Sequence, residues 1–521
     1  MRVGHAVLGG AVGVVWLVLP VMTINAEVPV AAARGGPVAD AGGHRQQVAE
    51  GATSADLVLP LVALGGVGVL AGYGYVRRTR RARTRTTPGV GIGIGVVSTQ
   101  PPVTPLPVLE RQAGAALVQA DDCLRTSREE LAFAEARFGA TAVEPFLQAL
   151  RDAERELSAA FAIRLRYDRG VPEPKEEAAR RQALAGIVGR CAEAGRRLDA
   201  EAPAFDQLRA LEQEMNEALG IAETRFRELA ARTGNVDATL TDLHARYPAP
   251  AASTATTTVT GYVEQAKDRL VFATTHLNQA RQAAYLGHTG EAVRSLRAAE
   301  GAISQADALL NDVDRLANSL AAAAQLVPAT LTGAESEIAR ATTKSPTGPL
   351  HTHLTHAHTT LAAVREELTG DRNRAHAHVH DPLDALRRIV QAMLPLSGAR
   401  DGVLGAAAWL VTRNDVGSAD GFVATHRGAV GVEARTRLAE AELLLATDPA
   451  AADEPALGAR ELAEQDVRVH GNPYTGTADE HTSGVGGAVL GGILLGEDPD
   501  GGPPLTFGGP ATRKRRALPP T

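Results

Sequence analysis

Cysteine, lysine and aromatic residues are scarce in this sequence of 521 residues. It has 2 cysteines, 3% aromatic residues and only four lysines among its 53 basic side chains. Two cysteines exclude a disulfide framework and a zinc module built from cysteines. The low aromatic content argues against several compact cores filled by large rings. The formal net charge of −7 argues against a dedicated nucleic-acid binder, so we expect no nucleic-acid partner.

The first 26 residues have the pattern of a secretory signal peptide. Arg2 precedes an apolar run from Ala6 to Leu19, and Ile24–Ala26 fits a cleavage site. An uncleaved membrane anchor is the alternative interpretation, since the run approaches the roughly 17 residues that a span requires. Residues 27–56 then form an extracytoplasmic segment, which is too short to bury a core.

Residues 57–76 are expected to form a transmembrane helix. This stretch carries no charge, and as a helix it is about 30 Å long, which matches the hydrocarbon core of a bilayer. Six arginines follow, which we expect to face anionic lipid: Arg77, Arg78, Arg80, Arg81, Arg83 and Arg85. Arginine beside a span marks the cytoplasmic side. The sequence therefore predicts a single-pass protein of the cell membrane, with its N-terminus outside after signal cleavage and its C-terminal region in the cytoplasm.

The rest of the chain has a helical pattern. After a basic juxtamembrane segment and linker over 77–107, apolar residues recur at steps of three and four. This pattern predicts one cytoplasmic helical region over 108–246, a linker over 247–258 and a second helical region over 259–446. The glycine- and proline-rich residues 447–521 are predicted to be a disordered tail. Carboxylates and arginines fall between the apolar stripes, so we expect them on solvated helix faces.

The strongest pattern is a pair of heptad stripes. Apolar residues keep heptad spacing over Val263–Ala284 and again over Ala292–Val327, with Gly287–Gly290 as the turn between them. A sustained heptad stripe must bury against another helix, and a short turn makes the two neighbours antiparallel. Pro328 is expected to end the second helix. The predicted fold class is all-α: one transmembrane helix, then an elongated antiparallel helical bundle or coiled coil, with disordered linkers and a disordered tail.

Seven of the 15 histidines fall between positions 351 and 380. Clustered neutral imidazoles can bind zinc, nickel or copper. The predicted metal ligands are His353, His356, His376, His378 and His380. The alternative is a histidine-biased, solvated connection that binds nothing. The two cysteines lie on or beside apolar stripes, so we expect Cys123 and Cys191 to be buried, inert thiols rather than nucleophiles.

Four stretches resemble bacterial TPM-domain membrane proteins: Leu109–Gly114, Phe205–Glu212, Arg427–Ala441 and Gly486–Gly496. The resemblance covers about residues 57–521 and implies a signal peptide, an extracytoplasmic TPM domain, one span and long cytoplasmic helices. In that family the TPM domain is an α/β module linked to phosphatase-like or assembly roles. Residues 27–56 stand in its place and are too short to hold it. The resemblance therefore implies a shortened member, to which the activity of that domain does not carry over.

Together these observations predict a non-enzymatic membrane protein without a cofactor. Its cytoplasmic coiled-coil region would be a scaffold or a surface for protein partners whose identity the sequence does not give, and self-association through the helices is a further possibility. The alternatives are a metal-binding or sensing protein that uses the histidine cluster, and a degenerate TPM-family protein without phosphatase-like activity.

Overall fold

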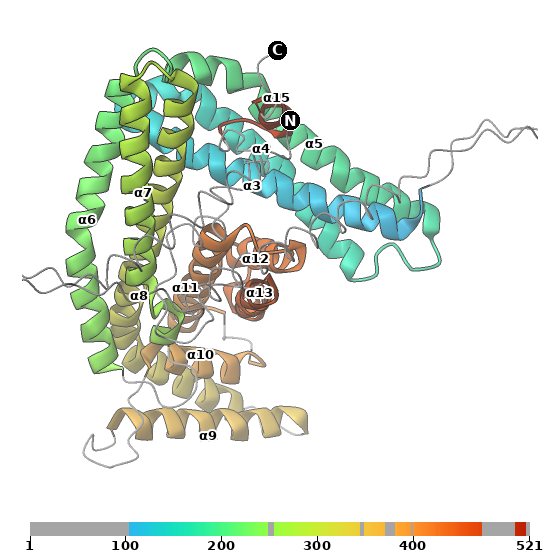
Figure 1. Cartoon of the computed structure of the whole chain (residues 1–521). Coiled ribbons are helices and arrows are strands. Elements are labelled where there is room, and N and C mark those ends of the chain that lie inside the picture. Colours follow the sequence, from blue (N-terminus) through green and yellow to red (C-terminus); the bar gives the residue numbers. More distant parts are fainter. Residues whose placement is uncertain are drawn as a thin grey trace, which may run out of the picture. The chain divides into compact units, whose positions relative to one another are not determined.

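The computed structural model describes residues 104–247, 255–343, 348–369, 381–396, 400–470 and 506–516 (Figure 1). Over these ranges every regular element is a helix, so the prediction of an all-α protein is confirmed. Among the helices so described, none combines the length and hydropathy that a membrane span requires. The predicted signal peptide, the extracytoplasmic segment, the transmembrane helix 57–76 and residues 77–103 lie outside the described ranges.

The first helical group consists of α3 (Leu106–Phe138), α4 (Ala140–Asp168) and α5 (Glu177–Arg209). Gly139 has a φ of 80° and separates the first two helices, a backbone geometry that glycine adopts readily. The apolar stripes that the sequence predicts meet in one core of this group, and their buried members include Leu117, Leu124, Phe146, Leu150, Leu157, Leu184, Ile187 and Leu198.

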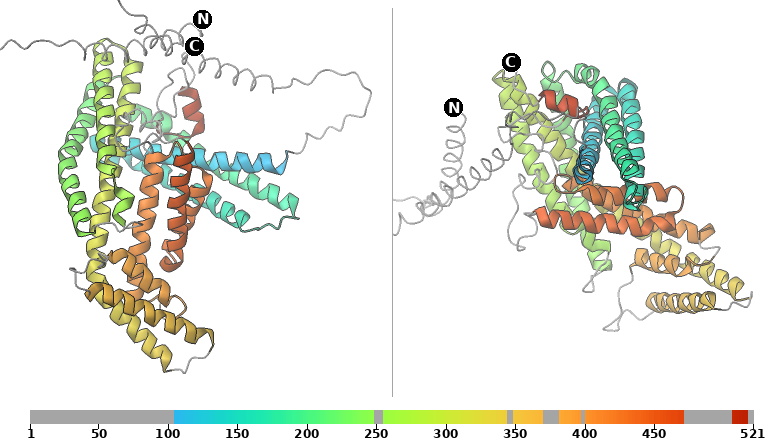
Figure 2. Two further views of the ribbon diagram at one scale, coloured as in Figure 1. Left: turned by 60° about the horizontal axis from the view of Figure 1, so that its bottom comes forward. Right: turned by 90° about the vertical axis from the view of Figure 1, so that its right-hand side faces the viewer.

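The second group is built on a helical hairpin. Its members are α6 (Met215–Arg246), α7 (Tyr262–Tyr285) and α8 (Thr289–Thr342), and α7 and α8 run side by side as the predicted antiparallel pair (Figure 2). Fully buried alanines recur every seven residues on both helices: Ala266, Ala273, Ala280, Ala292, Ala299 and Ala306. Such small side chains let the two helix axes approach closely.

The boundary predicted at residues 247–258 does not separate two cores. The helix α6 precedes it and packs against α7 and α8, which follow it, and all three share one hydrophobic core. The last residues of that linker begin a short 3₁₀ helix, η1 (Ala255–Val259), and Val259 is itself part of the core. The division into two helical regions therefore cuts through a packed unit.

Pro328 does not end α8, which continues to Thr342 and is 54 residues long. A proline ring removes a backbone hydrogen bond and usually kinks or ends a helix. The apolar stripe continues past it, because Leu331 and Ile338 are buried and α9 (Pro349–Thr369) packs against this end of α8. Burial of this stripe outweighs the lost hydrogen bond, so the prediction that the helix ends at Pro328 is wrong.

Four helices form the remainder of the main body: α10 (Pro382–Met393), α11 (Gly402–His426), α12 (Val432–Leu445) and α13 (Pro449–His470). Asp381 caps α10, since its carboxylate accepts the backbone N–H of Leu383 at 2.9 Å. The helices α11, α12 and α13 enclose a third core, which is lined largely by alanine and valine.

The prediction that residues 447–521 form a disordered tail is wrong for two stretches. One is α13, whose buried face is an alanine stripe with Ala456, Ala459 and Ala463 fully covered. The other is residues 506–516, which contain α15 (Pro510–Arg516) and pack beside α5 (Figure 1). The glycine and proline content of the whole segment concealed a helix-forming composition at its start.

Two glycines set the crossing of α11 over α8. A Cβ on Gly421 would lie 2.2 Å from a carboxylate oxygen of Asp312, and one on Gly417 would lie 2.9 Å from Nε of Arg315. Asp312 and Arg315 form an ion pair on α8. Burial raises the pKa of Asp312 to about 6, against the opposing effect of the Arg315 guanidinium. Gly417 and Gly421 lie one helical turn apart and have no side chain, so the backbone of α11 can lie directly over Asp312 and Arg315.

We expect Gly421→Ala to destabilise the full chain by about 1–3 kcal/mol, because the new methyl group overlaps the Asp312 carboxylate. The matched control is Gly234→Ala in α6, where a Cβ meets open space. That change should stabilise the chain by about 0.5–1 kcal/mol through helix propensity. Denaturant unfolding followed by circular dichroism measures both. Equal stability of the two variants would contradict the close approach of α11 to α8.

Candidate functional site

A group of largely buried charges joins α3 to the turn between α11 and α12. The side chain of Arg435 is 1% exposed and donates to the carboxylates of Asp121 and Asp122, the latter at 2.8 Å. Its other guanidinium nitrogens donate to the backbone carbonyls of Arg427 and Val430, at 2.8 and 3.2 Å. One arginine therefore fixes both the α11–α12 turn and its place on α3.

Two further arginines extend this polar junction, which we define as Asp121, Asp122, Arg125, Glu129, Asp420, Arg427 and Arg435. Arg125 on α3 lies 3.0 Å from Asp121 and reaches Asp420 on α11 at 2.7 Å. Arg427 makes a bidentate pair with Glu129, at 3.0 and 2.8 Å. Paired, parallel hydrogen bonds of this kind are the strongest contacts that arginine forms with a carboxylate.

The charges of the polar junction keep one another ionised. Burial alone would raise the pKa of Asp121, but the guanidinium groups of Arg125 and Arg435 outweigh it and hold that pKa below its usual value. Arg125 and Arg427 are buried too, and the adjacent carboxylates raise the pKa of each guanidinium despite its desolvation. The arrangement neutralises charge between helices. Its carboxylates are occupied as hydrogen-bond acceptors, so it positions helices rather than presenting a base to a substrate.

A second buried cluster joins α3 and α5 to α8. Arg209 at the end of α5 makes two hydrogen bonds to Glu300 of α8, at 2.8 and 2.7 Å. Arg297 of α8 lies 3.2 Å from Glu130 of α3. Burial raises the pKa of Glu300, against the opposing effect of Arg209. This cluster connects the first helical group to the hairpin. The polar junction connects the same helical group to α11 and α12.

Arg387 makes a similar connection further along the chain. It extends from α10 to the carboxylates of Asp415 on α11 and Asp453 on α13, and the Asp453 contact is 3.2 Å. Burial raises the pKa of Asp415 to about 6, because desolvation outweighs the attraction of Arg387. Two acids that share one arginine thus tie three helices together.

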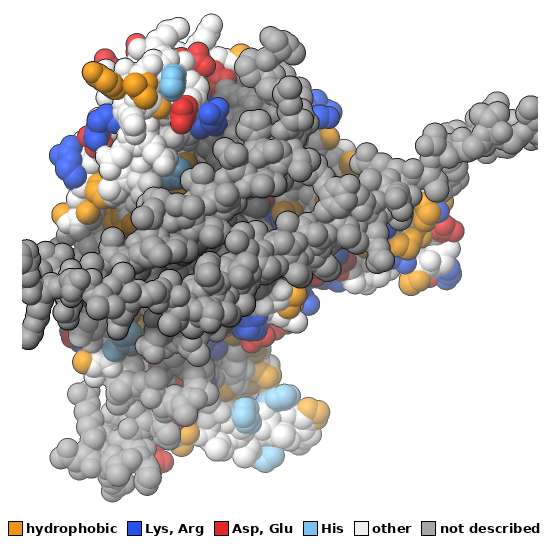
Figure 3. Space-filling view, in the orientation of Figure 1, with side chains coloured by type: hydrophobic (Ala, Val, Ile, Leu, Met, Phe, Trp, Pro, Cys, Tyr) orange, Lys and Arg blue, Asp and Glu red, His pale blue; other side chains and the backbone are white. Residues whose placement is uncertain are grey.

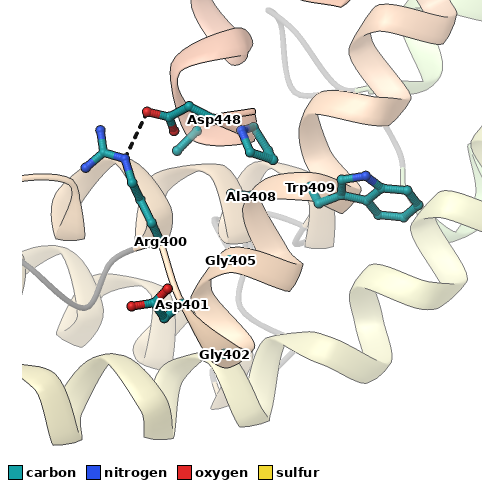
Figure 4. A pocket seen from close by; sticks show the side chains of 9 residues that line it. Arg400, Asp401, Gly402, Gly405, Ala408, Trp409 and Asp448 are labelled. Carbon is teal, nitrogen blue, oxygen red and sulfur yellow. Dashed lines mark hydrogen bonds and ion pairs between the residues drawn. The ribbon is translucent and has the colours of Figure 1, made fainter. Parts of the chain in front are cut away.

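A shallow pocket lies where α11 begins (Figure 4). Its volume is about 320 Å³, and its lining includes Arg400, Asp448 and Trp409. Arg400 pairs with Asp448 at 2.9 Å, and Asp401 also lies in the lining. The Trp409 ring is 43% exposed and has the Arg413 guanidinium 4.8 Å from its centroid. Such a lining can take a flat apolar group, but it presents no nucleophile with an adjacent base.

Two of the five predicted metal ligands lie in the described ranges. His353 and His356 lie on α9 with exposed side chains, beside the buried Leu354 and Ala357. Figure 3 shows histidine side chains at the surface in this part of the molecule. Within the described ranges no three metal-ligating side chains converge. The other three predicted ligands, His376, His378 and His380, lie outside those ranges, as do the six arginines from Arg77 to Arg85.

Both cysteines are buried, as the sequence predicts. Burial raises the pKa of the Cys123 thiol to about 11 and that of the Cys191 thiol to about 12. A thiol of such high pKa carries almost no thiolate at neutral pH, and the thiolate is the nucleophile. Neither cysteine is therefore suited to nucleophilic chemistry.

The expectation that charged residues lie on solvated faces is wrong for these clusters. The signal that could have revealed them is position: Asp121 comes four residues after Leu117 and three before Leu124, which places it on the apolar face of α3. Arg435, between Ala434 and Leu438 of the buried face of α12, has the same kind of position. A charge at a core position of a heptad stripe points to a buried partner.

Two curated proteins of Mycobacterium tuberculosis are similar to this chain: UPF0603 protein MT2410 of strain CDC 1551 / Oshkosh and UPF0603 protein Rv2345 of strain ATCC 25618 / H37Rv. Each is 30% identical over 449 residues, which cover 78% of this chain. The chain spans 65% of the length of these relatives. No family model matches the sequence, and no solved structure matches it.

We expect Arg435→Met to destabilise the full chain by about 3–5 kcal/mol, because it leaves Asp121 and Asp122 buried without this partner. Arg437→Met is the control on the same helix. Arg437 is 47% exposed and pairs with Glu440, so its loss should change stability by at most about 1 kcal/mol. Denaturant unfolding compares the two, and a cost for Arg435→Met no larger than for Arg437→Met would show that the junction does not hold the helices together.

Proposed function

We propose that this chain is a single-pass membrane protein whose cytoplasmic helices act as a non-enzymatic scaffold that binds protein partners. The proposal combines the uncharged residues 57–76 and the arginines that follow them with the all-α body described here. We further propose that it is related to the TPM-domain membrane protein group through the span and the cytoplasmic helices.

The way the body uses its charges supports a scaffold. Its buried arginines and carboxylates form ion pairs between helices, at the polar junction and at the Arg209–Glu300 cluster, rather than lining a cleft where they could serve catalysis. These contacts lock three cores into fixed relation, which a platform for partners requires. Two of the stretches on which the TPM resemblance rests supply arginines to these contacts: Phe205–Glu212 supplies Arg209, and Arg427–Ala441 supplies Arg427 and Arg435.

The observation that carries the partner-binding proposal is the end of the α7–α8 hairpin. Tyr285 is 91% exposed and Leu286 is 56% exposed there, just before the Gly287 turn. Behind them, α7 and α8 pack closely through their fully buried alanines. Tyrosine is enriched among the residues that anchor protein interfaces, because its large ring buries much apolar area while its hydroxyl keeps a polar contact.

We expect a photo-crosslinking amino acid at position 285 to capture a protein partner in intact cells. The matched control carries it at position 271, since Val271 is 64% exposed on the same hairpin but away from its end. Adducts are identified by mass spectrometry after membrane isolation, and an adduct of twice the chain mass indicates self-association. Equal adduct yields at the two positions would rule out the hairpin end as the contact.

Reporter fusions test the proposed orientation independently. A fusion after Arg85 should be active only with a cytoplasmic reporter, and a fusion at Gly42 only with a reporter that works outside the membrane. This follows from the arginine cluster beside the span. The opposite pattern would place the helical body on the outer side, and recovery of the chain in the soluble fraction would refute the membrane anchor.

A further inference from the structure

The C-terminal segment Thr506–Arg513 is held in a groove formed by α3, α4 and α5. Its anchor is Phe507, which is fully buried and stacks on Phe205 with ring centroids 4.4 Å apart. Phe146 packs against both rings in T-shaped geometry, with its ring centroid 5.2 Å from that of Phe205 and 5.9 Å from that of Phe507. The segment thus inserts one aromatic side chain into the core of the first helical group.

Polar contacts fix the backbone of the segment after its anchor. The carboxylate of Asp199 on α5 accepts the backbone N–H groups of Gly509 and Thr512, each at 2.9 Å, and that of Ala511 at 3.3 Å. It acts as the cap of α15, supplied by another helix. The N–H of Gly508 donates to the hydroxyl of Ser127 on α3 at 3.2 Å.

The fit requires glycine at two facing positions. A Cβ on Gly509 would lie 2.2 Å from the carbonyl oxygen of Gly195, and a Cβ on Gly195 would lie 2.6 Å from the Pro510 ring. The two backbones therefore touch, which no other pair of residues would allow. Beyond this contact, the Arg513 guanidinium donates to the carbonyl of Asp122 at 3.2 Å.

These are the features of peptide recognition. The helices α4 and α5 supply the two rings that receive the Phe507 anchor, and α5 supplies the close backbone contact at Gly195 and the carboxylate that accepts backbone N–H groups. The ligand comes from a distant part of the sequence, since residues 471–505 separate it from α13. Contacts of this kind specify a short linear segment rather than a helix packed along its length.

We propose that the groove between α3 and α5 is a peptide-binding site, and that its ligand is the chain's own C-terminal segment Thr506–Arg513, bound as a unit that can leave and rebind. This goes beyond the scaffold function and does not depend on it. The chemical class of ligand is a peptide with phenylalanine, two glycines and proline in succession, followed by a basic end. The chain's segment competes with such a peptide at an effective concentration of about millimolar.

The test uses the full chain and a synthetic peptide of residues 503–517 that is labelled at its C-terminal end. In the full chain with Phe507→Ala the groove loses its own anchor, so the peptide should bind saturably by fluorescence anisotropy. The wild-type chain should bind it at least about tenfold more weakly, because its own segment competes. The same peptide with Phe507→Ala should bind at least about 100-fold more weakly, because it lacks the anchor.

A folded Phe507→Ala chain that does not bind the peptide, or that binds it no better than the wild-type chain, overturns the proposal. A second experiment decides the case in which that variant fails to fold. A protease recognition sequence placed within residues 485–491 of the full chain allows the wild-type segment to be cut from the body after folding. Excess unlabelled peptide should then displace the cut fragment while the helical signal persists. A fragment that stays with the body under this excess would make the segment a fixed part of the fold and refute a binding site.

Discussion

Ion pairs between arginine and carboxylates, buried at the places where helical groups meet, are the interaction on which the rest of this structure depends. The described helices bury three apolar cores, and polar contacts join helices across them: Arg435 and Arg427 bind α3, and Arg209 binds α8. A guanidinium group suits this role because it stays charged and can satisfy several acceptors in one plane. Lysine, which is rare in the sequence, has neither property to the same degree.

Buried ion pairs between helices cost some stability, but they fix the relative positions of the helices. Removing two charges from water is expensive, and a well-packed apolar contact is often at least as stable as a buried pair. An apolar joint between alanine-rich helices would, however, leave their register loosely defined. A bidentate pair such as Arg427–Glu129 fixes one register, since the donors and acceptors match at one position only. Within the cores, alanine and glycine have the complementary role of bringing helices close enough for the pairs to form.

The helices themselves can be predicted from local sequence patterns, whereas the contacts between them cannot. Heptad spacing is enough to predict the α7–α8 hairpin, and the Asp381–Pro382 dipeptide is enough to predict the start of α10. The passage of α8 through Pro328 could not be predicted, because it depends on α9 covering the stripe beyond it. The helix α11 lies inside the predicted helical region, but its bounds could not be predicted, because its glycines weaken any helical pattern and are required by the partner helix α8 rather than by α11. Likewise Asp199 gives no sign in the sequence that it caps a segment more than three hundred positions away.

The length of α8 has a structural consequence. At 1.5 Å per residue its 54 residues measure about 80 Å, and it is in contact with α3, α6, α7, α9, α10 and α11 along the way. Its first turn adjoins the exposed Tyr285 and Leu286, and its last turns pack against α9, which bears His353 and His356. Two surfaces that share no residue are therefore joined by one continuous helix.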